Sequence, residues 1–214
     1  YTFLKEANFL IVTLGTAFNY HLKKSNENVA NCHKAPADYF KKKLIPTDGI
    51  ISEMLRALKA IDKFNPGLKI IFTVSPVKHV RDGVAENNRS KARLIEAAHS
   101  ICEQKQNAFY FPSYELVTDV LRDYRFYKND LVHPNETAIN VVFEKFADSF
   151  LNASSKKIME EIEKVLSAVN HKPFLKESEV HKKFVVSQLK IICDLEKNYP
   201  SLDLSKEKKY FEGM

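Results

Sequence analysis

The stretch KIIFTVSP, Lys69 to Pro76, decides the fold of this chain. After Lys69 comes an unbroken run of apolar and β-branched residues, which is typical of a strand buried on both faces, and Ser75-Pro76 ends the run. Two similar runs, NFLIVTL at residues 8–14 and AFYF at 108–111, predict further strands. Strands buried on both faces belong to parallel sheets with helices on either side, so we expect such a sheet here.

Segments with helical periodicity alternate with these strands. The first predicted helix begins at Thr47 or Asp48 as N-cap, and the second follows the charged loop VKHVRDGVAENN. The third begins at Pro112-Ser113, and the fourth has Asn135 as its N-cap. Their apolar stripes are Ile51, Leu55 and Leu58; Leu94, Ala98 and Ile101; Val117, Val120 and Leu121; and Ile139, Phe143, Phe146 and Phe150. A polar loop is expected through NVANCHKAP. The alternation predicts an α/β fold: a parallel sheet with helices on both faces, in a three-layer, flavodoxin-like arrangement.

Three strands make a thin sheet for this architecture, so we expect that strands upstream of Tyr1 are absent and that the sheet is truncated at the N-terminus. From residue 153 onward the composition shifts to lysine and glutamate without a strand signal, which predicts helices. Two apolar stripes flank a break at HKPF; they are Ile158, Ile162, Val165 and Val169, and then Val185, Leu189 and Ile192. We expect a partial α/β domain at 1–152 and a C-terminal helical hairpin at 153–214, packed on that domain or serving a partner.

Composition limits the possible functions. No apolar run approaches the roughly 20 residues of a membrane span. The net charge of +6 is spread along the chain, and the run Lys41-Lys42-Lys43 is short, so a nucleic-acid partner is not expected. The 3 cysteines show no paired spacing, which favours free thiols in a reducing, cytoplasmic compartment. No signal peptide is visible, although a removed N-terminus would hide one.

The candidate chemistry lies in loops that follow the strands. In open parallel sheets the site lies beyond the carboxyl ends of the strands, which here are followed by Gly15, Ser75 and Pro112. A fourth loop, NDLVHPNETA, contains Asp130 and His133. A histidine can take the proton of a serine nucleophile at neutral pH, and a carboxylate on its other ring nitrogen fixes its tautomer. The pair thus suggests a hydrolytic site, although this spacing also occurs by chance on protein surfaces.

A family resemblance strengthens this interpretation. The block DLVHPN is similar to the last block of the SGNH hydrolases, a superfamily of esterases and lipases whose aspartate and histidine have this spacing. The ordered motifs VTLGTAFNY, NCHK, FTVSPVKHVRDG, YFPSYEL and LRDYRFYKNDLVHP, through residues 8–145, resemble the GSCFA family, an SGNH-like bacterial group. The helical tail from HKPF onward also resembles that family's C-terminal extension.

The resemblance implies roles for particular residues. His133 would be the general base and Asp130 would orient it, while the nucleophilic serine would belong to a Gly-Ser-Cys-Phe-Ala segment. That segment does not occur in this sequence, which implies a position upstream of Tyr1. Many SGNH enzymes have an oxyanion-binding asparagine in Gly-x-Asn-Asp after the matching strand, where this chain has GTAF. The expected oxyanion and substrate-binding set is therefore Gly15, Thr16, Asn31, His33, Ser75 and His79, with Asn31 or Thr16 replacing the missing donor.

Other sites fit the sequence less well. Cys32 could be a nucleophile, and Ser75 could be one too, but Pro76 directly after Ser75 denies it the donor N–H of a typical nucleophile turn. No metal-ligand spacing or glycine-rich phosphate loop is present, so no cofactor is expected. We expect a serine hydrolase acting on a small-molecule or carbohydrate ester, inactive without its serine. The alternative is a binding or scaffolding module on a degenerate hydrolase fold, which the altered block after Leu14 favours.

Overall fold

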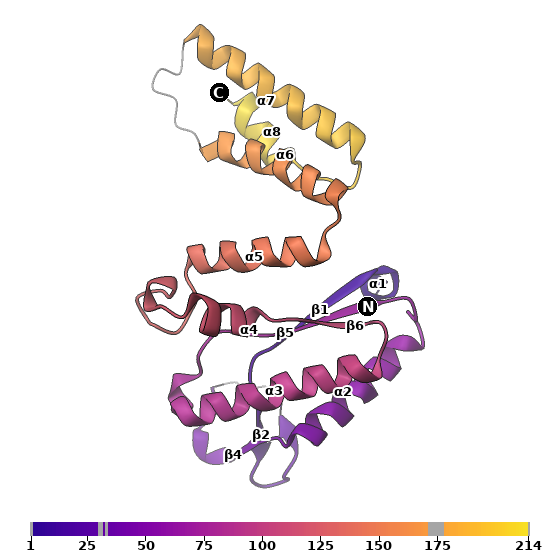
Figure 1. Ribbon diagram of the computed structural model, residues 1–214, viewed down its shortest axis with the longest axis vertical. Coiled ribbons are helices and arrows are strands. Elements are labelled where there is room, and N and C mark those ends of the chain that lie inside the picture. The colour runs from indigo at the N-terminus through magenta and orange to yellow at the C-terminus, as the bar shows by residue number, and fades with distance from the viewer. Residues whose placement is uncertain (1, 30–31, 33, 171–177, 214) are drawn as a thin grey trace. The chain divides into compact units, whose positions relative to one another are not determined.

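The computed structural model describes residues 2–29, 32, 34–170 and 178–213 (Figure 1). The chain divides into two compact units, Tyr1–Phe146 and Ala147–Met214. Among the described residues, the strands all lie in the first unit, and the regular elements of the second are helices. Each unit has its own hydrophobic core.

The main sheet of the first unit has three parallel strands in the order β1 (Phe9–Leu14), β5 (Lys69–Val74) and β6 (Ala108–Phe111). The predicted strands and their parallel arrangement are confirmed, although β1 alternates exposed and half-buried residues and is not buried on both faces. The register pairs Leu14 with Val74, and Thr73 with Phe111, so the three strands end together. The loops that begin at Gly15, Ser75 and Pro112 therefore leave the same edge of the sheet.

Helices α2 (Thr47–Asp62) and α3 (Val84–Gln104) cover one face of the sheet (Figure 1). Alternate side chains of the strands point to this face, because successive residues of a strand face opposite sides. The buried cluster between this face of the sheet and the two helices consists of Leu58, Leu68, Ile70, Phe72, Ala98, Ile101 and Ala108. α3 begins within the stretch that the sequence assigned to a charged loop, and neither Thr47 nor Asp48 caps α2, whose N-cap is Pro46.

The other face of the sheet is covered by the segment after β6. It comprises α4 (Ser113–Glu115), the π-helix η3 (Leu116–Leu121), the 3-10 helix η4 (Tyr124–Phe126) and α5 (Glu136–Phe150). Asn135 caps α5, since its Oδ1 accepts the N–H of Ala138 at 3.1 Å, as the sequence predicted. An apolar groove of about 410 Å³ lies between this face of the sheet and α5.

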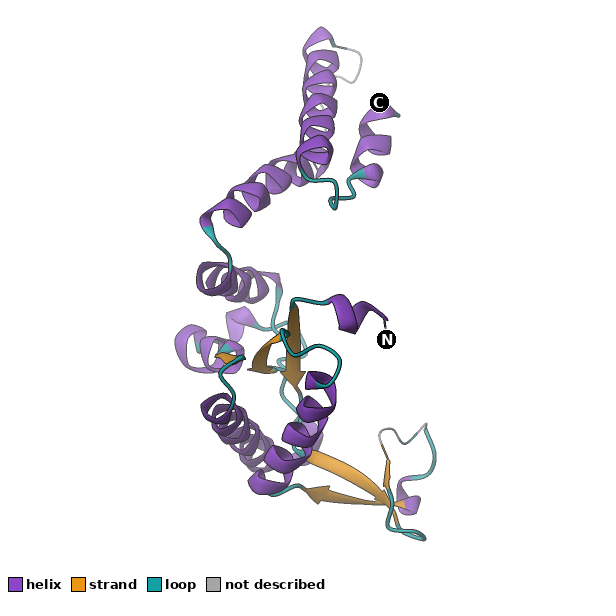
Figure 2. Ribbon diagram, turned by 90° about the vertical axis from the view of Figure 1, so that its right-hand side faces the viewer, coloured by secondary structure: helices purple, strands orange, loops and turns teal. Residues whose placement is uncertain are grey.

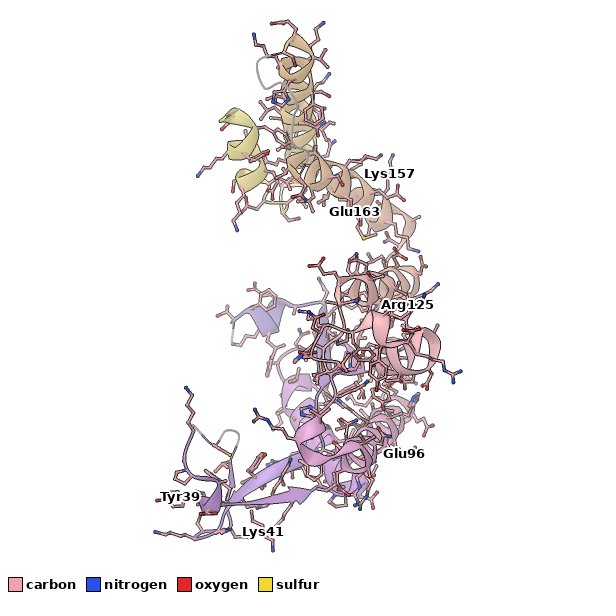
Figure 3. All side chains as sticks on the ribbon, turned by 90° about the vertical axis from the view of Figure 1, so that its left-hand side faces the viewer. Tyr39, Lys41, Glu96, Arg125, Lys157 and Glu163 are labelled. Carbon is pink, nitrogen blue, oxygen red and sulfur yellow. The ribbon has the colours of Figure 1, made fainter. Side chains whose placement is uncertain are left out.

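A second, antiparallel sheet was not predicted. Its strands are β2 (Phe18–Leu22), β3 (Asn28–Val29) and β4 (Phe40–Leu44) in the order β3-β2-β4, and Figure 2 shows it apart from the parallel sheet. The expectation of a polar loop is wrong for Asn28–Val29. In β2 the apolar residues Phe18, Tyr20 and Leu22 alternate with polar ones, so no continuous apolar run marks this sheet. Lys42 lies over the Phe18 ring at 4.4 Å, and Tyr39 and Lys41 project from the same region in Figure 3.

Three short helices complete the first unit: α1 (Thr2–Glu6) and the 3-10 helices η1 (Ala37–Tyr39) and η2 (Val80–Asp82). α1 is tied to the end of α2, because Asn65 Nδ2 donates to the carbonyl oxygens of Leu4 and Ala7 at 3.0 and 2.8 Å. η2 leads directly into α3.

The second unit contains α6 (Ala153–Asn170), α7 (Glu179–Asn198) and α8 (Ser205–Glu212). The two predicted helices are confirmed, α8 was missed, and the predicted break at HKPF lies outside the described residues. The core is formed by Val165, Ala168, Ile192, Leu195, Leu204 and Phe211. Across the described ranges, none of the helices is long and apolar enough to cross a membrane.

We expect Phe72→Ala to destabilise the first unit by about 3–5 kcal/mol, because the substitution leaves a cavity under a fully buried strand. Denaturant unfolding measures this loss. Phe109→Ala on the edge strand β6 is the matched control, because that ring is 41% exposed and its loss should be clearly smaller. Equal losses for the two variants would show that β5 is not the centre of the core.

Candidate functional site

The Asp130–His133 loop is closed at its base by backbone hydrogen bonds. Tyr127 and Pro134 form an isolated antiparallel bridge, and the N–H of Lys128 donates to the carbonyl oxygen of His133 at 2.7 Å. Next to the bridge, Asn135 donates its backbone N–H to Phe126 at 2.9 Å. The loop is therefore a short, tied hairpin with the Asp-x-x-His segment at its tip.

Asp130 accepts three hydrogen bonds within this tip. Its Oδ2 lies 2.7 Å from His133 Nδ1, and its Oδ1 accepts the N–H groups of Val132 at 2.9 Å and His133 at 3.0 Å. Leu131 between them adopts a left-handed conformation with φ of 58°, which turns the chain tightly enough for these contacts. The side chain of His133 is 54% exposed, and no hydrogen bond of the described residues engages its Nε2.

These contacts favour the ionised form of Asp130. The backbone N–H of His133, the N–H of Val132 and the imidazole together lower the pKa of Asp130 from 3.8 to about 2. Asp130 is therefore ionised at neutral pH, and a carboxylate at Nδ1 favours the tautomer with the proton on Nδ1. Nε2 is then the nitrogen with the free lone pair, on a side chain that is 54% exposed.

The loop after β5 contacts the Asp130–His133 loop directly. The N–H of Lys78 donates to the carbonyl oxygen of Val132 at 3.3 Å. The ammonium group of Lys78 lies 3.9 Å from the ring centre of Tyr127 and 4.5 Å from that of Tyr124, which is cation–π geometry. The loop at the carboxyl end of β5 and the Asp130–His133 loop are thus held together, as the sheet topology leads one to expect.

The serines near this edge of the sheet have other partners. The Ser75 Oγ accepts the N–H of Val77 at 3.3 Å, and the Ser113 Oγ donates to the Val74 carbonyl oxygen at 2.8 Å. Among the described residues, no serine forms a hydrogen bond with His133. The structure therefore gives Ser75 no contact that would activate it as a nucleophile.

The other expected site residues are found in three settings. Gly15 and Thr16 lie at the end of β1, where the Thr16 Oγ1 is 3.2 Å from the Ser90 Oγ on α3. His79 precedes η2, and its N–H donates to the Asn87 Oδ1 at 2.9 Å. Asn31 and His33 lie outside the described residues, and Cys32 between them is a partly exposed free thiol.

Three buried polar residues of α3 were missed by the sequence analysis. Asn87, Ser90 and Lys91 are 7%, 2% and 1% exposed. Ser90 accepts the N–H of Ala17 at 2.7 Å, while Lys91 donates to the carbonyl oxygens of Gly15 and Ser75, both at 2.7 Å. A signal was present: these residues continue the stripe of Leu94, Ala98 and Ile101 toward the N-terminus at helical spacing. Asn87 lies in the stretch that was assigned to a charged loop, whereas Ser90 and Lys91 follow that stretch.

A cavity of about 490 Å³ is lined in part by Asp130. Its walls contain both aromatic and polar side chains. Its lining residues include Lys78, Asn87, Asn88, Tyr114, Thr118, Asp119, Tyr124 and Asp130.

Comparison with protein families identifies the chain. A model described as "GSCFA family" matches residues 1–146. The chain belongs to the GSCFA family. A second model, "GSCFA domain protein, C-terminal domain", matches residues 162–214, and a search of the curated proteins found no match. Asp130 and His133 lie in the first GSCFA range, and α7 and α8 lie in the second.

The NMR chemical shift of the Asp130 carboxyl carbon should change with a midpoint at about pH 2, below the ordinary aspartate pKa of 3.8. Because the folded-state pKa is lowered, the contribution of Asp130 to the free energy of unfolding is complete above 3.8 and is lost as the pH falls toward 2. In His133→Ala both backbone donors remain, so the midpoint should stay below 3.8. A wild-type midpoint at the ordinary value would contradict the geometry of the loop.

Proposed function

We propose that this GSCFA protein is a serine hydrolase of the SGNH type that acts on esters, with Asp130 and His133 as the base half of its triad. The observation that carries this proposal is the 2.7 Å hydrogen bond between Asp130 Oδ2 and His133 Nδ1, with Nε2 left open to solvent. The loop after β5 contacts the Asp130–His133 loop at Val132, at the carboxyl edge of a parallel sheet, which is the usual place for an active site in such folds.

The proposed reaction follows from the two ring nitrogens. His133 Nε2 takes the proton of a serine hydroxyl as that oxygen attacks the ester carbonyl, and the ionised Asp130 stabilises the imidazolium that forms. The imidazolium then gives the proton to the leaving alcohol, and the acyl group remains on the serine. A water molecule, deprotonated by His133, then attacks the acyl carbonyl, and the imidazolium returns the proton to the serine oxygen as the acid is released.

The serine itself comes from a segment other than the 214 residues in this proposal. The hydroxyls of Ser75 and Ser113 have other partners, which supports this view. β1 also has room for a neighbour, because within the described sheet it pairs with β5 alone. On the face turned toward α5, its Ile11 is 53% exposed. A parallel strand added beside β1 would end at the carboxyl edge of the sheet, where the Asp130–His133 loop lies.

An O-acyl group on a carbohydrate is the substrate class that the adjoining cavity supports best. Tyr114 and Tyr124 offer aromatic surfaces, and Asn88, Thr118 and Asp119 offer polar groups. Such a mixed wall can both pack against a sugar ring and bond its hydroxyls, whereas a fatty chain needs a wall that is apolar throughout. The cavity is lined by Asp130, Leu131 and Val132, the three residues directly before His133, which places it beside the proposed base.

A binding or scaffolding module is the second candidate function. The GTAF block at Gly15–Phe18 favours it, because the amide donor expected there in an SGNH enzyme is missing. A module of this kind would keep the fold and the cavity while giving no turnover in any longer form of the protein.

His133→Ala should slow labelling of the serine-containing protein by a fluorophosphonate about 10²–10⁴-fold, because the proton acceptor is lost. Gel fluorescence after timed labelling measures the rate. His21→Ala is the matched control, since that imidazole bonds Asn19 within the small sheet, and its labelling rate should not change. Unchanged labelling of His133→Ala would remove His133 from the triad.

The 214-residue chain alone should not hydrolyse p-nitrophenyl acetate above the rate of a Ser75→Ala control. The reason is that the Ser75 hydroxyl already serves as acceptor for Val77 and is not bonded to the base. Turnover that disappears in Ser75→Ala would contradict the proposal that the nucleophile lies elsewhere.

A further inference from the structure

Lys91 is the most unusual charged residue of the first unit. Its side chain extends from α3 to the carboxyl edge of the sheet and is 1% exposed. Its ammonium group donates to the carbonyl oxygens of Gly15 and Ser75, both at 2.7 Å, and no described ion pair includes it. One side chain therefore joins the loops that follow β1 and β5.

An ammonium group is costly to bury. Burial lowers the pKa of Lys91 to about 8, while the two carbonyl oxygens and the Tyr114 ring, 5.9 Å away, favour the charged form. An apolar side chain would continue the stripe of α3 without this cost. What Lys91 adds is a fixed direction for two backbone carbonyls.

The direction of the Gly15 carbonyl sets the direction of the next N–H. In a trans peptide the C=O and the N–H point to opposite sides, and no cis peptide bond occurs in the described chain. Lys91 holds the Gly15 oxygen toward α3, so the N–H of Thr16 points away from α3. That is the side of the sheet on which Pro134, next to His133, lines the groove with α5.

The N–H of Thr16 is also available. None of the described hydrogen bonds gives it an acceptor, whereas the next N–H, of Ala17, donates to Ser90. The other carbonyl held by Lys91 cannot orient a donor in this way, because the residue after Ser75 is Pro76. The clamp thus presents one backbone donor at the end of β1.

We propose that Lys91 is a positioning residue that fixes the Gly15–Thr16 peptide, so that the N–H of Thr16 binds the oxyanion of the tetrahedral intermediate. The proposal rests on the hydrolase function proposed above. It explains how the site supplies a donor although the GTAF block has no asparagine. A backbone N–H held by a buried cation needs no reorganisation during the reaction, which is what oxyanion stabilisation requires.

The clamp can be tested in the 214-residue chain without any activity. The carbonyl ¹³C shifts of Gly15 and Ser75 should titrate together with a midpoint near pH 8, the pKa of Lys91. Tyr114 is the titratable side chain that faces Lys91 from α4, and burial raises its pKa, so its titration falls at higher pH. Carbonyl shifts that do not respond together near pH 8 would overturn the clamp.

Two variants and one control complete this test. In Lys91→Met both responses should vanish, and in Lys59→Met, an exposed lysine of α2, they should persist. Lys91→Arg retains a cation at high pH, so it too should abolish the step near pH 8, and it decides the matter if Lys91→Met does not fold. A step that persists in either Lys91 variant overturns the assignment.

The catalytic role needs the serine-containing protein. Lys91→Met should lower kcat about 10²–10³-fold with little change in KM, as loss of one oxyanion donor does, and Lys91→Arg should restore part of kcat. A wild-type protein with turnover and a Lys91→Met variant with unchanged kcat would refute the positioning role. A wild-type protein without turnover would refute the hydrolase proposal and with it the oxyanion role, while the carbonyl titration would still decide the clamp.

Discussion

The hydrogen-bonded register of β5 between β1 and β6 is the constraint on which the rest of the first unit depends. Every residue from Ile70 to Val74 is buried, so the strand cannot shift without moving polar groups into the core. Because the pairing is parallel and in register, three loops leave one edge together. Residues distant in sequence, at the ends of β1 and β5 and in the Asp130–His133 loop, can meet only through this arrangement.

Two charged side chains of opposite sign shape that edge in the same way. Asp130 accepts backbone N–H groups and thereby holds an imidazole, whereas Lys91 donates to backbone carbonyls and thereby holds two loops. In both cases the charge is balanced mainly by peptide dipoles. Peptide dipoles are fixed by the fold, so the geometry of the edge does not depend on the rotamer of an opposing charged partner.

The sequence predicted the parts of the molecule that rest on apolar periodicity. The buried strands and the stripes of α2, α5, α6 and α7 each depend on many residues of one kind, and Asp130 and His133 were visible because their spacing has a chemical meaning. The small sheet was missed because its short strands alternate apolar and polar residues and contain no continuous apolar run. Lys91 was missed for a different reason: its partners are the backbone carbonyls of Gly15 and Ser75, which are distant in sequence, and only the fold brings them to its side chain.

The open side of β1 has a practical consequence for work with the protein. A strand edge with free N–H and C=O groups and apolar side chains is a template for pairing with the same edge of another molecule. Phe9 and Ile11 are 56% and 53% exposed, and the ammonium group of Lys69 lies 5.6 Å from the centre of the Phe9 ring. Purified at high concentration, the 214-residue chain is therefore prone to edge-to-edge aggregation, and this limits the concentrations at which its spectra can be recorded.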